Sequence, residues 1–281
     1  MPTFPTPDPI WAAVEILSGD VRITAADRAE TVVDVRPADP SDDHDVKTAE
    51  ATHVECANGH LVVKTPQARS WLPRRGGGSI AVSIEMPTGS HLYGTAQSGD
   101  FQASGRIGDC RIKTGRGHVR LDEVAALSVK SAMGDVTVDH VTGDMQITLA
   151  SGDVRVGEVD GAGIVKNASG DISVGVAHRD LNVKNASGDI AVDVADAAVA
   201  VKTAKGSIRT GDVARGSVVL ETHQGDVEVG IRGGTAAWLD VNTSLGSVIN
   251  ELAASPAPGA TEDKVEVRAR TSVGDVLIRR P

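Results

Sequence analysis

The chain has 281 residues, enough for one large domain or two of ordinary size, and 40% of them are hydrophobic. Aromatic residues make up only 2%, so a core must consist of valine, isoleucine, leucine and alanine, many of which favour extended backbone. A net charge of −10 at pH 7 argues against nucleic-acid binding, which needs a concentrated basic surface.

The first ten residues, MPTFPTPDPI, hold several prolines and no basic leader, unlike a secretory signal. No apolar run approaches the roughly 20 residues that span a bilayer. Cys56 and Cys110 lie far apart in the sequence, and we expect both to be free thiols. The sequence therefore predicts a cytoplasmic protein without a membrane span.

Residues 1–86 alternate apolar and polar side chains as strands do, but outside the regular spacing that follows them. An acidic loop at Pro37–Asp45 interrupts the alternation. We interpret this segment as an irregular β cap continuous with the rest of the fold, because the end of a repeat stack must be covered. Residues 87–281 then form the repeats, and the whole chain is one structural domain. The expected strands of the cap are Ala12–Thr24, Glu30–Val35, His53–Thr65 and Ser79–Met86.

A loop at Gln67–Ser79 places Trp71 beside Arg74 and Arg75 in an otherwise acidic chain that is poor in aromatic residues. Tryptophan and arginine are among the residue types most enriched at binding hot spots. Two interpretations remain open. Either Trp71 covers the N-terminal end of the core and the arginines are solvated, or the loop contacts a partner. Trp71, Arg74 and Arg75 are therefore the candidate partner-contact residues.

From residue 99 onward, turn glycines recur with spacings of 18, 17, 18, 18, 18, 18 and 19 residues. Segments one period apart are alike, for example LNVKNASGDIAVDV at 181–194 and IVKNASGDISVGV at 164–176. Such a period indicates a repeat architecture. The glycines are Gly99, Gly117, Gly134, Gly152, Gly170, Gly188, Gly206 and Gly225.

Further glycines at half the period divide each repeat into two strands and two turns. Within a strand the apolar residues alternate, as Leu181 and Val183 do on one side of a turn and Ile190 and Val192 on the other. One repeat cannot bury its apolar face alone, whereas stacked repeats share a continuous core. A hairpin meander also fits the strands. We favour an all-β, single-chain β-solenoid (β-helix) of about 18-residue, two-strand coils, because equivalent residues recur every second strand.

Three columns of side chains should run along the stack. Thr114, Ser131, Asn167, Asn185, Thr203 and Thr222 predict a polar ladder between coils. Lys113, Lys130, Lys166, Lys184 and Lys202 predict an exposed, solubilising face. Asp100, Asp135, Asp153, Asp171, Asp189 and Asp226 directly follow the turn glycines. These carboxylates either accept hydrogen bonds from turn backbone or hold cations. We favour the first, because the glycine pattern of calcium-binding β-rolls is missing.

Two further coils are expected at the C-terminal end, over Trp238–Asn250 and Val265–Arg280. A loop rich in proline, alanine and glycine, Ala253–Thr261, separates them.

The chain resembles the bacterial putative-adhesin family, a β-strand-repeat domain of unknown function common in actinobacteria. The resemblance rests on the ASGD turns at 150–153, 168–171 and 186–189, on SIEMPTGSHL at 83–92 and on RTSVGDVLIRR at 270–280, and it covers nearly the whole chain. It implies a right-handed β-solenoid. It implies no catalytic, cofactor-binding or metal-binding residues.

No phosphate-binding loop, HExxH, CxxC or nucleophile elbow occurs in the sequence, and the histidines show no metal-ligand spacing. His140 and His178 are most simply exposed turn residues. We therefore expect no enzyme, no cofactor and no metal. The predicted function is a non-catalytic scaffold or protein-interaction module, with an unknown partner or self-association. A cytoskeletal, bactofilin-like polymer is the alternative, and a polysaccharide lyase is a more distant one.

Overall fold

The structure, a computed structural model, describes residues 1–66, 77–252 and 263–281. The chain divides into two compact units, Met1–Val138 and Asp139–Pro281. Strands make up most of both units, as predicted. Within the described ranges, no helix is long and apolar enough to cross a membrane.

In the first unit, strand β2 (Trp11–Ala26) lies between two coils. On one edge it pairs in parallel with β5 (His60–Lys64) and β6 (Ser79–Pro87), and on the other with β7 (His91–Ser98) and β8 (Phe101–Arg116). β8 then pairs in parallel with β9 (Val119–Met133). The stacked parallel coils therefore begin with β5 and β6, and β2 forms the next coil.

The expected irregularity before residue 86 is visible as antiparallel pairs. β1 (Thr3–Pro5) pairs with β3 (Glu30–Pro37), β3 pairs with β6, and β4 (His53–Ala57) pairs with β5. These strands agree with the ranges expected from the alternation of apolar residues. The division of the chain at residue 86 remains a prediction.

The acidic segment that we expected to be a loop contains the one helix of the described residues, α1 (Asp43–Glu50). The carboxylate of Asp42 caps the helix by accepting a hydrogen bond from the backbone N–H of His44 at 2.8 Å. Asp45 is buried and accepts hydrogen bonds from the backbone N–H groups of Asp39 and Ser79. The acidic residues thus satisfy backbone donors, and the prediction of a loop over 37–45 was wrong in its last three residues.

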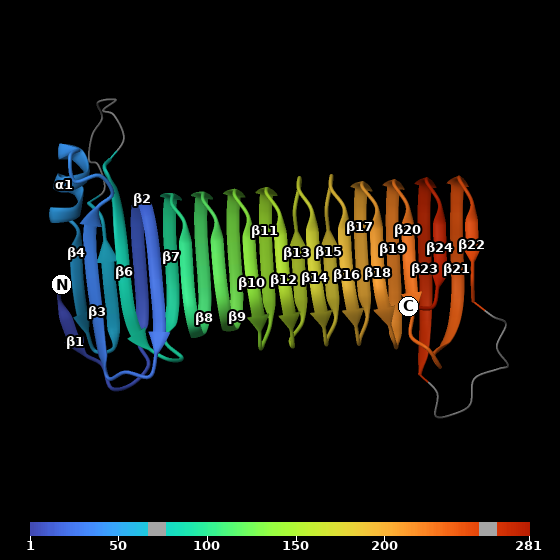
Figure 1. Cartoon of the computed structure of the whole chain (residues 1–281), viewed down its shortest axis with the longest axis horizontal. Helices are drawn as coiled ribbons and strands as arrows, with labels where there is room; N and C mark the ends of the chain where they lie inside the picture. Colours follow the sequence, from blue (N-terminus) through green and yellow to red (C-terminus); the bar gives the residue numbers. More distant parts are fainter. Residues whose placement is uncertain (67–76, 253–262) are drawn as a thin grey trace. The chain divides into compact units, whose positions relative to one another are not determined.

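The second unit is a regular stack of two-strand coils, drawn from yellow-green to red in Figure 1. Between Met145 and Val213, every strand pairs in parallel with the strand two places further along the chain, and Ile172, Ile190 and Ile208 are partners in successive coils. This register confirms the solenoid and excludes the hairpin meander. After β10 (Val136–Val141), one strand column holds β11 (Met145–Ser151), β13 (Gly163–Lys166), β15 (Leu181–Lys184), β17 (Val199–Lys205) and β19 (Gly216–Gln224), and the other holds β12 (Val154–Val159), β14 (Ile172–Ala177), β16 (Ile190–Ala195), β18 (Ile208–Val213) and β20 (Val227–Ile231).

The core of each coil is a thin layer of aliphatic side chains. Ile172, Val174, Ile190 and Val192 are buried, while the residues between them point outward. The composition thus predicted the core correctly. The exception is Phe101 in the first unit, a fully buried aromatic side chain.

The two C-terminal coils form, but in reversed order. β23 (Lys264–Val273) pairs with both β19 and β21 (Ala236–Leu245), and β24 (Val276–Arg279) pairs with both β20 and β22 (Val248–Asn250). The last strands of the chain therefore lie inside the stack, and β21 and β22 form its terminal coil (Figure 1).

Both cysteines are free, as expected. Cys110 lies on β8 and is buried, and burial raises the pKa of its thiol to about 12. The half-buried Cys56, on β4, has a pKa raised in the same direction by its lesser burial.

We therefore expect a disulfide reagent to modify Cys56 and to spare Cys110 in the folded protein, because only a thiolate that the reagent can reach reacts. Thiol release from dithionitrobenzoate, counted before and after unfolding in denaturant, measures this. In the Cys56→Ser variant the folded protein should release none. Rapid release from folded Cys56→Ser would contradict the burial of Cys110.

Candidate functional site

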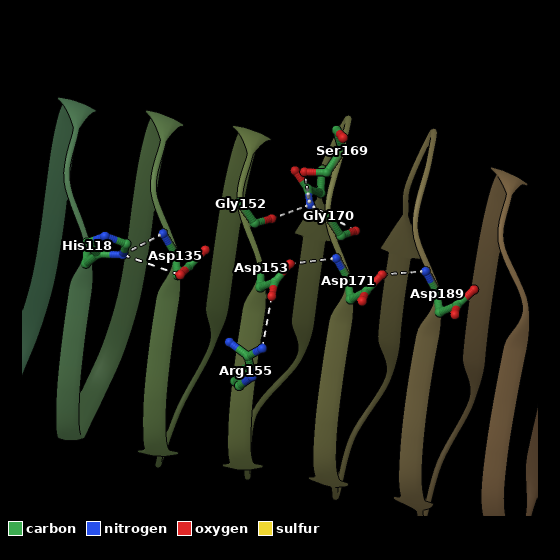
Figure 2. Close-up of polar contacts among 10 residues, drawn as sticks. His118, Asp135, Gly152, Asp153, Arg155, Ser169, Gly170, Asp171 and Asp189 are labelled. Carbon is green, nitrogen blue, oxygen red and sulfur yellow. Dashed lines mark hydrogen bonds and ion pairs between the residues drawn. The ribbon is translucent and has the colours of Figure 1, made fainter.

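The turn aspartates link each coil to the next (Figure 2). The backbone N–H of Asp171 donates to Asp153 Oδ1 at 3.0 Å, and the N–H of Asp189 donates to Asp171 Oδ1 at 2.9 Å. The ladder continues with Ser207 N–H donating to Asp189 Oδ1 at 2.8 Å. These bonds confirm the backbone-accepting role that we favoured for this column, which makes its aspartates part of the framework.

The polar column also bonds between coils, in a different way from the ladder we expected. The Nδ2 atoms of Asn167 and Asn185 donate at 2.9 Å to the backbone carbonyls of Gly152 and Gly170 in the preceding coil. The Thr222 hydroxyl donates in the same way to the carbonyl of Gly206. These side chains stabilise turn backbone rather than one another. The lysine column is exposed, as predicted.

The second turn of each coil gathers histidines and carboxylates from several coils of the second unit. His140 lies near the end of β10, and Glu158 near the end of β12. Asp160 and His178 occupy equivalent turn positions after β12 and β14, and Asp196 follows β16. The backbone N–H groups of these three turn residues donate to carbonyls at the end of the strand one coil earlier, which fixes the turns at one edge of the stack.

The side chains of this cluster are in hydrogen-bond contact. His140 Nε2 lies 3.0 Å from Asp160 Oδ2, and His178 Nε2 lies 2.9 Å from Glu158 Oε1 and 3.9 Å from Asp160 Oδ1. The other ring nitrogen of His178, Nδ1, lies 2.9 Å from Asp196 Oδ2. The four side chains of His140, Glu158, Asp160 and His178 are called the histidine–carboxylate cluster below.

Charges of opposite sign alternate along this turn edge. Hydrogen bonds with Glu158 and then Asp196 raise the pKa of His178 above its usual range. Partial burial opposes ionisation of Asp196, but hydrogen bonds from His178 and Arg232 outweigh it and hold the pKa of that carboxyl below its usual range. Arg232 also forms a bond with Asp212. These contacts therefore favour the protonated form of His178 and the ionised form of Asp196.

His140, Glu158 and Asp160 each offer a ligand atom, and these atoms lie within 4.8 Å of one another. Ligand spacing within one local segment of the sequence does not reveal this group, because its members come from separate coils. The signal was the period itself: His140 and Glu158 are 18 residues apart, and so are Asp160 and His178. Residues one period apart become neighbours in adjacent coils.

The three candidate partner-contact residues, Trp71, Arg74 and Arg75, lie outside the described residues, so their role remains a prediction.

The terminal coil of the second unit has an uncovered edge. Among the described residues, β21 pairs only with β23, and β22 only with β24. Val227 and Val276 are fully buried, yet Val248, which occupies the same column in the terminal coil, is 46% exposed. Trp238, Leu245 and Ile249 are exposed as well. This coil therefore presents an apolar strand edge to solvent.

The model of one protein family, described as Toastrack DUF4097, matches residues 12–215 and 164–280. No curated protein matches the chain. Among solved structures, a putative adhesin from Parabacteroides merdae is similar over 100% of this chain and 95% of its own, with 10% identity and a TM-score of 0.43. Putative adhesins from Parabacteroides distasonis and Bacteroides fragilis show the same coverage, with 11% and 13% identity and TM-scores of 0.38 and 0.29.

Proposed function

The chain belongs to the Toastrack DUF4097 family, and we propose that this member is a non-catalytic β-solenoid scaffold that pairs with a second copy of itself through the open edge of its terminal coil. The observation that carries the proposal is the edge formed by β21 and β22. An unpaired strand edge is a ready template for another strand, because its outward N–H and C=O groups have no partner within the sheet.

The composition of this edge supports the proposal. Natural edge strands are commonly protected by lysine, proline or other charged residues. Within β21 and β22 the one charged residue is Asp240, and its carboxylate is engaged by Arg268 Nε and Arg270 Nη2, each at 3.2 Å, in the adjacent coil. Asn250 brings a polar side chain to the column of the buried Ile278, but no charge. The edge thus lacks charged protection.

A second copy is the partner that this edge fits most simply. Two identical edges can pair about a two-fold axis, and each β21 then lies antiparallel to the other. Such a contact closes on itself, so it gives a dimer rather than a fibre. The apolar side chains beside the edge, Trp238, Leu245 and Ile249, would be covered in the same step.

The Trp238→Lys/Ile249→Lys double variant is expected to abolish this dimer, because it places positive charges from both copies beside the shared edge. Sedimentation equilibrium over a wide concentration range measures the effect. Wild type should approach twice the mass of the chain as concentration rises, and the variant should remain a monomer. Ile164→Lys is the matched control, because Ile164 is 40% exposed on β13, inside the stack.

A wild-type protein that stays monomeric at every concentration would refute the self-association. Species that keep growing and pellet would favour the polymer that we considered as an alternative. Release of unsaturated products from acidic polysaccharides would favour a lyase.

We also propose that Trp71, Arg74 and Arg75 contact a partner and that the protein is cytoplasmic. Capture of a partner by wild type, but not by the Trp71→Ala variant, would support the partner-contact role.

A further inference from the structure

The histidine–carboxylate cluster has the composition of a metal site. Imidazole nitrogens together with carboxylate oxygens suit zinc and neighbouring divalent transition ions, whereas calcium and magnesium prefer oxygen ligands alone. We propose that His140, Glu158 and Asp160 bind one zinc-class divalent ion in the second unit, with His178 Nε2 as the fourth ligand. This proposal replaces the expectation of no metal that we drew from the sequence.

The distances within the cluster fit one shared ion. Two ligand atoms that each lie about 2.1 Å from a zinc ion are roughly 3.0–3.4 Å from one another. His140 Nε2 and Asp160 Oδ2 are 3.0 Å apart, and His178 Nε2 and Glu158 Oε1 are 2.9 Å apart. His178 Nε2 and Asp160 Oδ1 lie 3.9 Å apart, which is longer than this range, so binding of the fourth ligand requires the His178 side chain to shift toward the other three. The ligand atoms of His140, Glu158 and Asp160 thus lie within 4.8 Å of one another, and His178 Nε2 contacts two of these three residues.

An independent feature orients one ligand. The Nδ1 atom of His178 bonds to the carboxylate of Asp196, which is held in turn by Arg232 Nη1 at 3.3 Å. Metal-binding histidines usually donate their second ring N–H to such a carboxylate, which fixes the tautomer that leaves Nε2 free for the ion. Asp196 is thus a positioning residue for His178.

The surroundings of the cluster also attract cations. A hollow beside it is lined by three carboxylates, those of Asp144, Asp160 and Asp180, and by one cationic side chain, that of Arg179. Carboxylates gathered at one turn edge lower the electrostatic potential at the place where an ion would bind. The two cluster histidines are partly exposed, so an ion can reach them from solvent.

The test is calorimetric titration of zinc chloride into the chelator-treated full chain, prepared without a histidine tag. Wild type should bind one ion per chain in a saturable step. His140→Ala and His178→Ala should each weaken binding at least ten-fold. Asp196→Asn keeps all four ligands and should weaken binding roughly ten- to hundred-fold, as the loss of an orienting partner does. Far-UV circular dichroism without zinc confirms that each variant is folded.

His118→Ala is the matched control. His118 is also an exposed turn histidine paired with an aspartate, Asp135 at 3.4 Å, but it lies in the first unit and outside the cluster. Its loss should leave zinc affinity unchanged. Three results would overturn the proposal: no saturable binding, equal binding by wild type and a His140→Ala/His178→Ala double variant, or calcium binding at the same residues with zinc excluded.

Discussion

Gly188→Val is expected to lower the free energy of unfolding by about 3–5 kcal/mol, which makes it one of the most damaging single substitutions in the chain. Two costs add. Gly188 has φ +130°, a conformation that β-branched residues avoid, and the strain contributes about 1–3 kcal/mol. A side chain at this position would also collide with the preceding coil.

The collision follows from how closely the turns stack. A Cβ atom on Gly188 would lie 2.6 Å from the carbonyl carbon of Gly170 and 3.0 Å from Asp171 Oδ1, and closer still to the Gly170 carbonyl oxygen. Backbone at that distance cannot yield without breaking the ladder in which Asp189 N–H donates to Asp171. A valine side chain at position 188 would therefore push the backbones of two adjacent coils apart, because the atoms that it meets first are backbone atoms of Gly170.

Urea unfolding followed by far-UV circular dichroism measures the loss. Gly233→Ala should be nearly neutral, because Gly233 has no positive φ and a Cβ added there would meet no heavy atom within 4 Å. Asp189→Ala should cost about 0.5–1.5 kcal/mol, since it removes the acceptor of the Ser207 N–H and no more. A Gly188→Val protein as stable as Asp189→Ala would show that the coils can separate freely, contrary to the close stacking of their turns.

Regular coils such as those around Gly188 could be predicted because the glycine period, the alternation of apolar residues and the turn chemistry all point to one arrangement. The period fixes which residues become neighbours, so the pairing of Ile172 with Ile190 follows from the 18-residue spacing. The framework role of the turn aspartates follows as well, because a carboxylate directly after a turn glycine lies beside the backbone of the next coil.

The ends could not be predicted in the same way. The apolar alternation in Trp238–Asn250 and Val265–Arg280 marks strands but does not say which strand each one pairs with, so the exchanged order of the last two coils was not anticipated. The helix at Asp43–Glu50 has few apolar residues and depends on capping by Asp42 and on the contacts of Asp45, which form only when Ser79 is nearby. Both features depend on tertiary context.

The candidate site was only partly accessible from the sequence. The histidine–carboxylate cluster combines residues from three coils, and its members look unrelated unless they are placed on the period. The open edge was not accessible at all, because Val248 has the same residue type as the buried Val276 and differs only in what lies beyond it.

Phe101→Ala is expected to cost about 3–5 kcal/mol, the usual range for deleting a fully buried aromatic ring. The ring lies in the core of the first unit, where the neighbouring inward positions of other coils carry aliphatic side chains. Gly94 makes room for it: a Cβ on Gly94 would lie 2.5 Å from Phe101 Cε1 and 3.0 Å from Cζ. The register pairs Gly94 with Ile112, so glycine stands where the next coil has a large side chain.

Gly94→Val should therefore destabilise wild type but stabilise the Phe101→Ala protein, because the valine fills part of the cavity that the ring leaves. Gly94 has no positive φ, so valine at this position meets no backbone strain. In a double-mutant cycle measured by urea unfolding, the Gly94→Val/Phe101→Ala protein should be about 1–3 kcal/mol more stable than the sum of the two single effects predicts. Val129→Ala/Gly94→Val is the control pair. Val129 is also buried, on β9, so its truncation leaves a cavity at a different position from that of the Phe101 ring. Additive effects of Gly94→Val and Phe101→Ala would mean that the glycine is not there to accommodate the ring.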